Sequence, residues 1–339
     1  MEHRRREPAP GIFRLVLPLP FPGLTRVNAY LIRDGDGCTL VDCGIHDPGL
    51  EDGGFPELVD ALKACDVSVS DVTRLVVTHP HIDHYGMAGR LIEEAGCELW
   101  MHETSTEDLE AYEDPSGVAE RLRRMLEDHG IPPEEVEDLA AFEDWRPFVS
   151  DVVEATARLK GGETFKAGGR TWSIVYTPGH AKSHLCVWDA RDHVLISGDH
   201  LLPTITPHID FKRGDSDPLG DFLASLDKVV DLDPALVLPG HGRPFEDGGE
   251  RARVIIRHHD RRLGSILQVI RREAHTADEI TDEIFGDELL NFERRLALGE
   301  ALAHLAHLRN AKEIERVERP DGTFAYRKAA RRRVAEEDE

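Results

Sequence analysis

Short apolar runs bounded by turn residues recur along the first third of the chain, and they predict β-strands. These runs cover residues 12–19, 28–33, 38–41, 74–78 and 98–101. An Asp34-Gly35-Asp36-Gly37 segment between the second and third runs is typical of a hairpin turn. Residues 55–64 instead place Leu58, Ala61 and Leu62 on one side of a predicted helix.

The same pattern returns in the second half of the chain. Strands are predicted at residues 172–176, 184–188, 194–197 and 235–238, with a helix near 219–230. Strands with intervening helices in both halves predict an α/β fold in which two sheets form a sandwich. We assign this domain to residues 1–249.

Two segments depart from the alternation. Residues 103–150 read as helices broken at prolines, and their 15 acidic and 4 basic residues give a net charge of −11. After residue 249, helices are predicted at 251–274, 276–284 and 292–308, and a hairpin at 315–326. Thr276 and Glu279 form a capping-box pattern at the start of the second of these helices. This order outlines a small winged-helix-like domain over residues 250–330, and we expect the charged tail 331–339 to be disordered.

Composition narrows the function classes. The 41 Lys and Arg residues against 65 Asp and Glu give a net charge of −24, which disfavours nucleic acid as a partner without excluding it. No apolar stretch is long enough to span a bilayer, and no signal-peptide core follows the charged start. The five cysteines are scattered without a CxxC pair, which is typical of reduced thiols in the cytoplasm.

The densest chemical signal lies between residues 78 and 84. Four potential ligands, His79, His81, Asp83 and His84, directly follow a predicted buried strand. Imidazoles and a carboxylate suit Zn²⁺ best among divalent ions, with Fe or Mn as alternatives.

Three further candidates follow later strands. His180, Asp199 and His241 each come directly after a predicted strand and beside a glycine. A single histidine in such a place is more often structural than a ligand. Four candidate positions along one rim of the fold, however, favour a metal site.

Together these motifs resemble the metallo-β-lactamase-fold hydrolases, over roughly residues 12–244. The family's HxHxDH motif matches His79, His81, Asp83 and His84, and its later ligands match His180, Asp199 and His241. Its supporting DxG element matches Asp42 and Gly44. The resemblance implies an αββα sandwich with two divalent metal ions. One ion would be held by His79, His81 and His180, the other by Asp83, His84 and His241, with Asp199 bridging.

The resemblance also implies a mechanism and a substrate class. A hydroxide shared by the metals would attack the substrate, Asp83 would orient that nucleophile, and Tyr85 could donate to an oxyanion or simply pack. The glyoxalase-II-like relatives lead us to expect a small-molecule thioester or ester as substrate. The C-terminal part resembles the winged-helix appendage of lactamase-β-like proteins, a branch that includes endoribonucleases, so endoribonuclease or lactonase activity is the alternative. The 103–150 insertion is a possible lid or a surface contact, and the C-terminal domain a possible homodimer interface.

Overall fold

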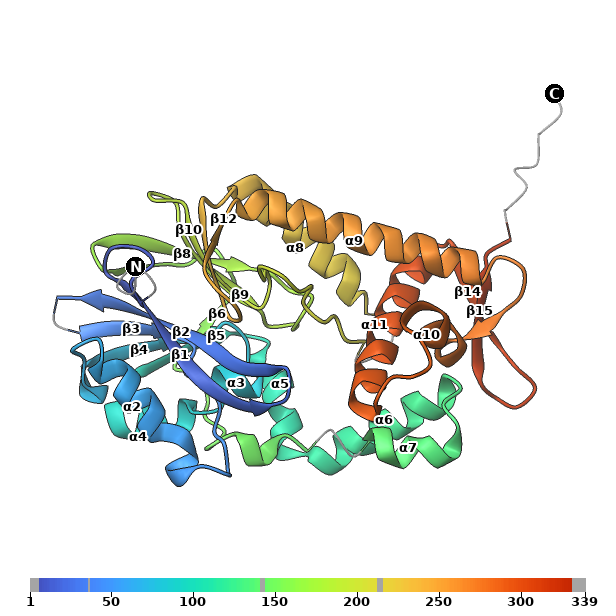
Figure 1. The fold of residues 1–339 in the computed structure, drawn as a ribbon, viewed down its shortest axis with the longest axis horizontal. Helices are drawn as coiled ribbons and strands as arrows, with labels where there is room; N and C mark the ends of the chain where they lie inside the picture. The colour runs from blue at the N-terminus through green and yellow to red at the C-terminus, as the bar shows by residue number, and fades with distance from the viewer. Residues whose placement is uncertain (1–5, 36, 141–143, 212–215, 331–339) are drawn as a thin grey trace. The chain divides into compact units, whose positions relative to one another are not determined.

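The computed structural model describes residues 6–35, 37–140, 144–211 and 216–330 (Figure 1). The chain forms two compact units. The first comprises residues 1–119, 143–209 and 220–256, and the second comprises 120–142, 210–219 and 257–339. Within the described ranges, no helix is both long and apolar enough to cross a membrane.

The first unit contains two six-stranded sheets. The first sheet has the order β1-β2-β3-β4-β5-β6. Its strands are β1 Ile12–Phe21, β2 Leu24–Asp34, β3 Gly37–Val41, β4 Val72–Val76, β5 Glu98–His102 and β6 Ala157–Leu159. The second sheet has the order β12-β11-β10-β9-β8-β7. Its strands are β7 Thr164–Ala167, β8 Arg170–Tyr176, β9 Leu185–Asp189, β10 Val194–Gly198, β11 Leu236–Pro239 and β12 Phe245–Glu246.

The core lies between the sheets and beneath the helices. One buried cluster joins both sheets, with Tyr30 and Val76 from the first and Trp172 and Ile196 from the second. A second cluster packs the other face of the first sheet against helices, with Leu58 and Leu91 among its members. The helices of this unit include α2 Phe55–Lys63, α3 Ile82–Tyr85, α4 Ala88–Ala95 and α5 Ser105–Glu113, and short 3₁₀ turns lie at Glu51–Gly54, Val69–Asp71 and Arg146–Phe148. The predicted α/β fold, in which two sheets form a sandwich, is confirmed.

The second unit is built from helices and a small sheet. Its elements include α7 Pro133–Ala140, α10 Ala277–Phe285, α11 Asn291–Asn310, β13 His275–Thr276, β14 Ile314–Glu318 and β15 Phe324–Lys328. Three helices have residues in both units: α6 Pro115–Asp128, α8 Pro218–Leu232 and α9 Gly248–Val269. One buried cluster joins the insertion to the C-terminal helices, with Leu126 and Leu139 beside Leu298 and Leu302.

Most predicted elements match the structure within a few residues. The capping box is present, because Thr276 N donates to Glu279 Oε2 at 2.8 Å and Glu279 N donates to Thr276 Oγ1 at 3.2 Å. The predicted helix 251–274 ends earlier, at Val269, where Arg271 N bonds Gln268 O, three residues back, instead of the residue four back. Asp36 of the first hairpin turn and the tail 331–339 lie outside the described residues. The domain limits 1–249 and 250–330 stay a prediction.

Candidate metal centre

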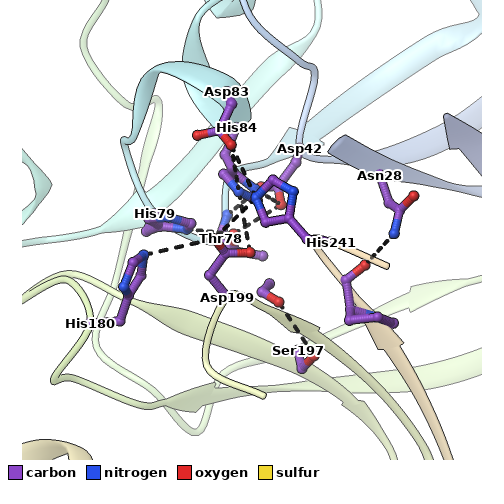
Figure 2. A network of polar contacts seen from close by, with 12 residues as sticks. Asn28, Asp42, Thr78, His79, Asp83, His84, His180, Ser197, Asp199 and His241 are labelled. Carbon is purple, nitrogen blue, oxygen red and sulfur yellow. Dashed lines mark hydrogen bonds and ion pairs between the residues drawn. The ribbon is translucent and has the colours of Figure 1, made fainter. Parts of the chain in front are cut away.

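The candidate ligands lie where strands of the first unit end. His79 and His81 follow β4, and Asp83 and His84 lie in the short helix α3. Further along the chain, His180 follows β8, Asp199 follows β10, and His241 follows β11. Figure 2 shows that six of these side chains, from segments that follow strands of both sheets, turn toward one another: His79, Asp83, His84, His180, Asp199 and His241. The structure brings these candidate ligands together at one rim of the first unit.

The ligand atoms fall into overlapping groups. His79, His81 and His180 form one group, Asp83, His84 and His241 another, and His79, His84 and Asp199 a third, each with its atoms within 4.8 Å of one another. Asp199 lies between the first two groups: its Oδ2 is 3.9 Å from His180 Nε2 and 3.2 Å from His241 Nε2. One carboxylate is thus close to side chains of both groups.

Hydrogen bonds direct one ring nitrogen of four histidines away from the centre. The Nδ1 partners are Thr78 Oγ1 for His79 (3.0 Å), Asp42 Oδ2 for His84 (2.8 Å), His208 O for His180 (2.7 Å) and Arg26 O for His241 (3.0 Å). With Nδ1 engaged in this way, Nε2 is the nitrogen that is left to bind a metal.

The inward atoms fit a cation. His79 Nε2, His84 Nε2, His180 Nε2 and Asp199 Oδ1 are buried and make no hydrogen bond within the described part of the chain. Buried polar atoms normally have a partner, and leaving one without costs about 1–3 kcal/mol. A divalent ion would satisfy all four, so the residues present fit a metal centre.

The electrostatics point the same way. Burial lowers the pKa of His79 and His180, so both rings stay neutral, as ligands must. Burial would also lower the pKa of His241, but Asp199 and Asp83 outweigh it and raise that pKa to about 10. Burial of Asp83 would raise its pKa, but His84 and His241 outweigh that effect and lower the pKa to about 2. Carboxylate charge is therefore concentrated on one side of the centre, where a cation would balance it.

The predicted supporting residues lie beneath this centre. Asp42 Oδ1 accepts from Thr78 N at 2.7 Å, and Oδ2 accepts from Thr78 Oγ1 at 2.9 Å as well as from His84. Thr78 Oγ1 in turn accepts from His79. One carboxylate thereby orients a histidine in each of the first two groups. Gly44 has a φ of +87°, which favours glycine, and a Cβ there would lie 2.6 Å from Leu17 Cδ1.

Tyr85 lies in the core rather than at the centre. Its side chain is fully buried, and its hydroxyl bonds Val153 N at 2.8 Å and Val153 O at 3.2 Å. This geometry favours packing over the alternative of a contact with substrate.

The sequence analysis missed His184. Its Nε2 accepts from Asp199 N at 3.2 Å, and its Nδ1 bonds Thr177 Oγ1 at 2.9 Å, so it holds the backbone that carries Asp199. The residue begins a segment interpreted only as a strand. Its spacing of four residues from His180 was the available signal.

A further group of possible metal ligands lies in the second unit. It comprises His258, His259 and Glu300. Arg262 already forms an ion pair with Glu300, and His259 bonds His304 at 3.1 Å. Because Glu300 and His259 already have these partners, we interpret the group as part of the packing of the second unit.

Two family models match the chain. Residues 22–241 match the metallo-beta-lactamase superfamily, and residues 263–329 match the metallo-beta-lactamase-like, C-terminal domain. Every candidate ligand lies within the first match.

Individual proteins are similar over nearly the whole chain. A probable metallo-hydrolase of Bacillus subtilis (strain 168) is 26% identical, with 87% of this chain and 91% of that protein covered. A metallo-beta-lactamase family protein from Thermus thermophilus is 30% identical with a TM-score of 0.79, covering 94% of this chain and 99% of that one. A beta-lactamase domain protein from Burkholderia ambifaria is 32% identical with a TM-score of 0.82, covering 95% and 93%.

Proposed function

The chain belongs to the metallo-β-lactamase superfamily, and we propose that it is a dinuclear metal-dependent hydrolase that cleaves a small-molecule thioester or ester. The observation that carries the proposal is the convergence of three loops on a fourth, which carries Asp199, with histidine Nε2 atoms buried around that carboxylate. His79, His81 and His180 would hold one divalent ion, and Asp83, His84 and His241 the other, with Asp199 shared. Zn²⁺ suits this donor set best, with Fe or Mn as alternatives.

The chain's own residues would prepare the reaction. When bound, two divalent cations supply Lewis acidity and lower the pKa of water toward neutrality. Asp83 keeps its carboxylate ionised, so it can accept a hydrogen bond from the attacking water and orient it. Asp42 and Thr78 fix the histidine tautomers, and burial of the site limits competing solvent.

Positive side chains beside His241 support an acyl donor with an anionic leaving group. Arg14 Nη2 donates to Gly242 O at 2.8 Å, Arg26 O accepts from His241, and Arg243 follows two residues later. Burial lowers the pKa of Arg14, the interaction with Tyr30 raises it, and the charges of Arg243 and Arg26 lower it further. In a chain of net charge −24, such a cluster favours thioesters of glutathione or coenzyme A, whose carboxylates or phosphates it would attract.

Ribonuclease activity remains the second candidate, with less support. The second unit, for which we propose a winged-helix arrangement, would be expected to present free basic side chains to RNA. In α11, however, Arg294 pairs with Asp282 at 2.7 Å, and Arg295 pairs with Asp210 at 3.3 Å. These arginines are already neutralised by carboxylates.

The test is thiol release from a panel of acyl-glutathione and acyl-coenzyme A thioesters. We expect release that requires metal, disappears in His81→Ala and weakens with added salt. Lactones and a single-stranded RNA are assayed in parallel. A metal-loaded protein that cleaves RNA or lactones but no thioester would refute the proposed substrate class.

We also propose a cytoplasmic location. The five cysteines are all free and buried, which supports folding in a reducing compartment.

A further inference from the structure

Helix α5, at the start of the acidic insertion, contacts the loop that carries His79 and His81. Tyr112 is buried in this helix, and its hydroxyl donates to Pro80 O at 2.6 Å. Pro80 lies between the two histidines and has no N–H of its own. The tyrosine therefore holds the carbonyl, which is the one hydrogen-bonding group that the backbone of Pro80 offers.

The same helix also reaches the loop that carries His180. Ser183 is buried, and its Oγ donates to Asp108 Oδ2 at 2.8 Å. Lys182 pairs with Glu107 at 2.8 Å, but both side chains are more than half exposed, so this pair contributes little. Helix α5 thus contacts both loops that supply His79, His81 and His180.

A second buried tyrosine stands in the corresponding place near His241. Tyr30, in β2, donates from its hydroxyl to Pro239 O at 2.8 Å. Pro239 also lacks an N–H and lies two residues before His241. Asn28 Nδ2 donates to the same carbonyl at 2.7 Å, so the contact of Tyr30 is partly shared.

We propose that Tyr112 and Tyr30 are positioning residues that separately control metal affinity in the two halves of the centre. Tyr112 would set the affinity of the His79, His81 and His180 half, and Tyr30 that of the half containing His241. The inference rests on the proposed two-metal function. It also gives the acidic insertion a role in holding the metal loops.

The physical reason is the geometry that a metal requires. Removing a hydroxyl leaves a proline carbonyl with one donor fewer, and the loop relaxes by a fraction of an ångström. Loss of a group that orients a metal ligand typically weakens metal binding about 10- to 100-fold. We expect an effect in that range for Tyr112→Phe. For Tyr30→Phe we expect a smaller, roughly tenfold effect, since Asn28 remains on the carbonyl.

The test uses ¹¹³Cd²⁺ as the probe and NMR as the readout. The full chain is stripped of metal and loaded with two equivalents of ¹¹³Cd²⁺. Because the two halves differ in histidine and carboxylate donors, two resonances are expected. The variants His81→Ala and His241→Ala assign them. A competing chelator is then titrated into the wild type, Tyr112→Phe and Tyr30→Phe.

Tyr326→Phe is the matched control. Tyr326 is a buried tyrosine of the second unit, and its hydroxyl bonds His129 Nδ1 at 3.3 Å. Circular dichroism and the melting temperature of each metal-free variant check the fold. Ser183→Ala, which removes the other buried contact of α5, replaces Tyr112→Phe if that variant does not fold.

We expect Tyr112→Phe to lose the resonance assigned by His81→Ala at about 10- to 100-fold lower chelator concentration, while the other resonance persists. Tyr30→Phe should show the reverse selectivity, and Tyr326→Phe should match the wild type. Equal loss of both resonances in each variant, or no change in either, would overturn the inference. A single resonance in the wild type would overturn both the inference about the two tyrosines and the two-metal arrangement. Selective loss in a protein that hydrolyses no thioester would refute the proposed substrate class and leave the inference standing.

Discussion

Replacing Asp42 by Asn tests how the centre orients its ligands. The carboxylate is 2% exposed and accepts bonds from Thr78 N, Thr78 Oγ1 and His84 Nδ1, at 2.7, 2.9 and 2.8 Å. All three partners are donors, whereas an asparagine amide has only one oxygen. Whichever way the amide turns, its NH₂ group faces a donor. An NH₂ group in the place of Oδ1 opposes Thr78 N, whereas one in the place of Oδ2 forces His84 to move its proton to Nε2, the nitrogen that would bind the metal.

The expected magnitude follows from the contact that is lost. A hydrogen bond to a charged group contributes about 1.5–3 kcal/mol, and each 1.4 kcal/mol is a factor of ten in affinity. We therefore expect Asp42→Asn to weaken metal binding about 10- to 100-fold. The substitution adds no backbone strain, because Asp42 has a φ of +62° and Asn tolerates this left-handed conformation as well as Asp does. Asp42→Ala would combine the loss of the hydrogen bonds with backbone strain at this positive φ, so the two effects could not be separated.

The assay is chelator competition for Zn²⁺, followed by the metal content of the recovered protein. Asp47→Asn serves as the control, because Asp47 lies in the same segment and, among the described residues, its carboxylate accepts a hydrogen bond from Gly49 N alone, at 2.9 Å. The melting temperature of the metal-free protein tests whether Asp42→Asn still folds. A folded variant that binds Zn²⁺ as tightly as the wild type would refute an orienting role for Asp42.

The remaining predictions concern the bridging carboxylate, a close contact and acid stability. Asp199→Ala should lose activity and bound metal together, and full occupancy by two metals in that variant would contradict the bridging role. Gly240→Ala should weaken metal affinity more than tenfold, because its Cβ would lie 2.3 Å from Asp199 Oδ1. The control is Gly264→Ala, whose Cβ would have open space around it and which should match the wild type in metal content. Burial lowers the pKa of His129 to about 4, so its neutral form stabilises the folded state by about 3 kcal/mol above pH 6.5, and this contribution is lost as the pH falls toward 4. Urea unfolding between pH 7 and pH 4 should show that loss, and His129→Gln should reduce it; an equal loss in both proteins would contradict the assignment.

The strands and the shared rim could be predicted because local pattern and topology agree. Residues 74–78 form an apolar run that must be buried, and the ligand cluster follows it directly, so the cluster had to emerge at the end of β4. The same logic applied to His180, Asp199 and His241. The strands β6, β7 and β12 were missed because they have only two to four residues, too few for a period to show.

His184 and Tyr112 were not identified because their roles depend on contacts distant in sequence. His184 reads as the start of a buried strand, and nothing in that pattern shows that its ring faces Asp199 N, 15 residues later. Tyr112 reads as an apolar position of an acidic helix. Its hydroxyl meets Pro80, 32 residues earlier, only after the helix packs on the first sheet.

The acidic insertion combines two structural roles, which changes how a lid would have to work. Helix α5 lies in the first unit and bonds the metal loops through Tyr112 and Ser183. Residues 120–142 of the insertion belong to the second unit, where Leu126 and Leu139 are buried with C-terminal helices. Burying a leucine contributes about 1.5–3 kcal/mol, so helices α6 and α7 cannot open by themselves without exposing that core.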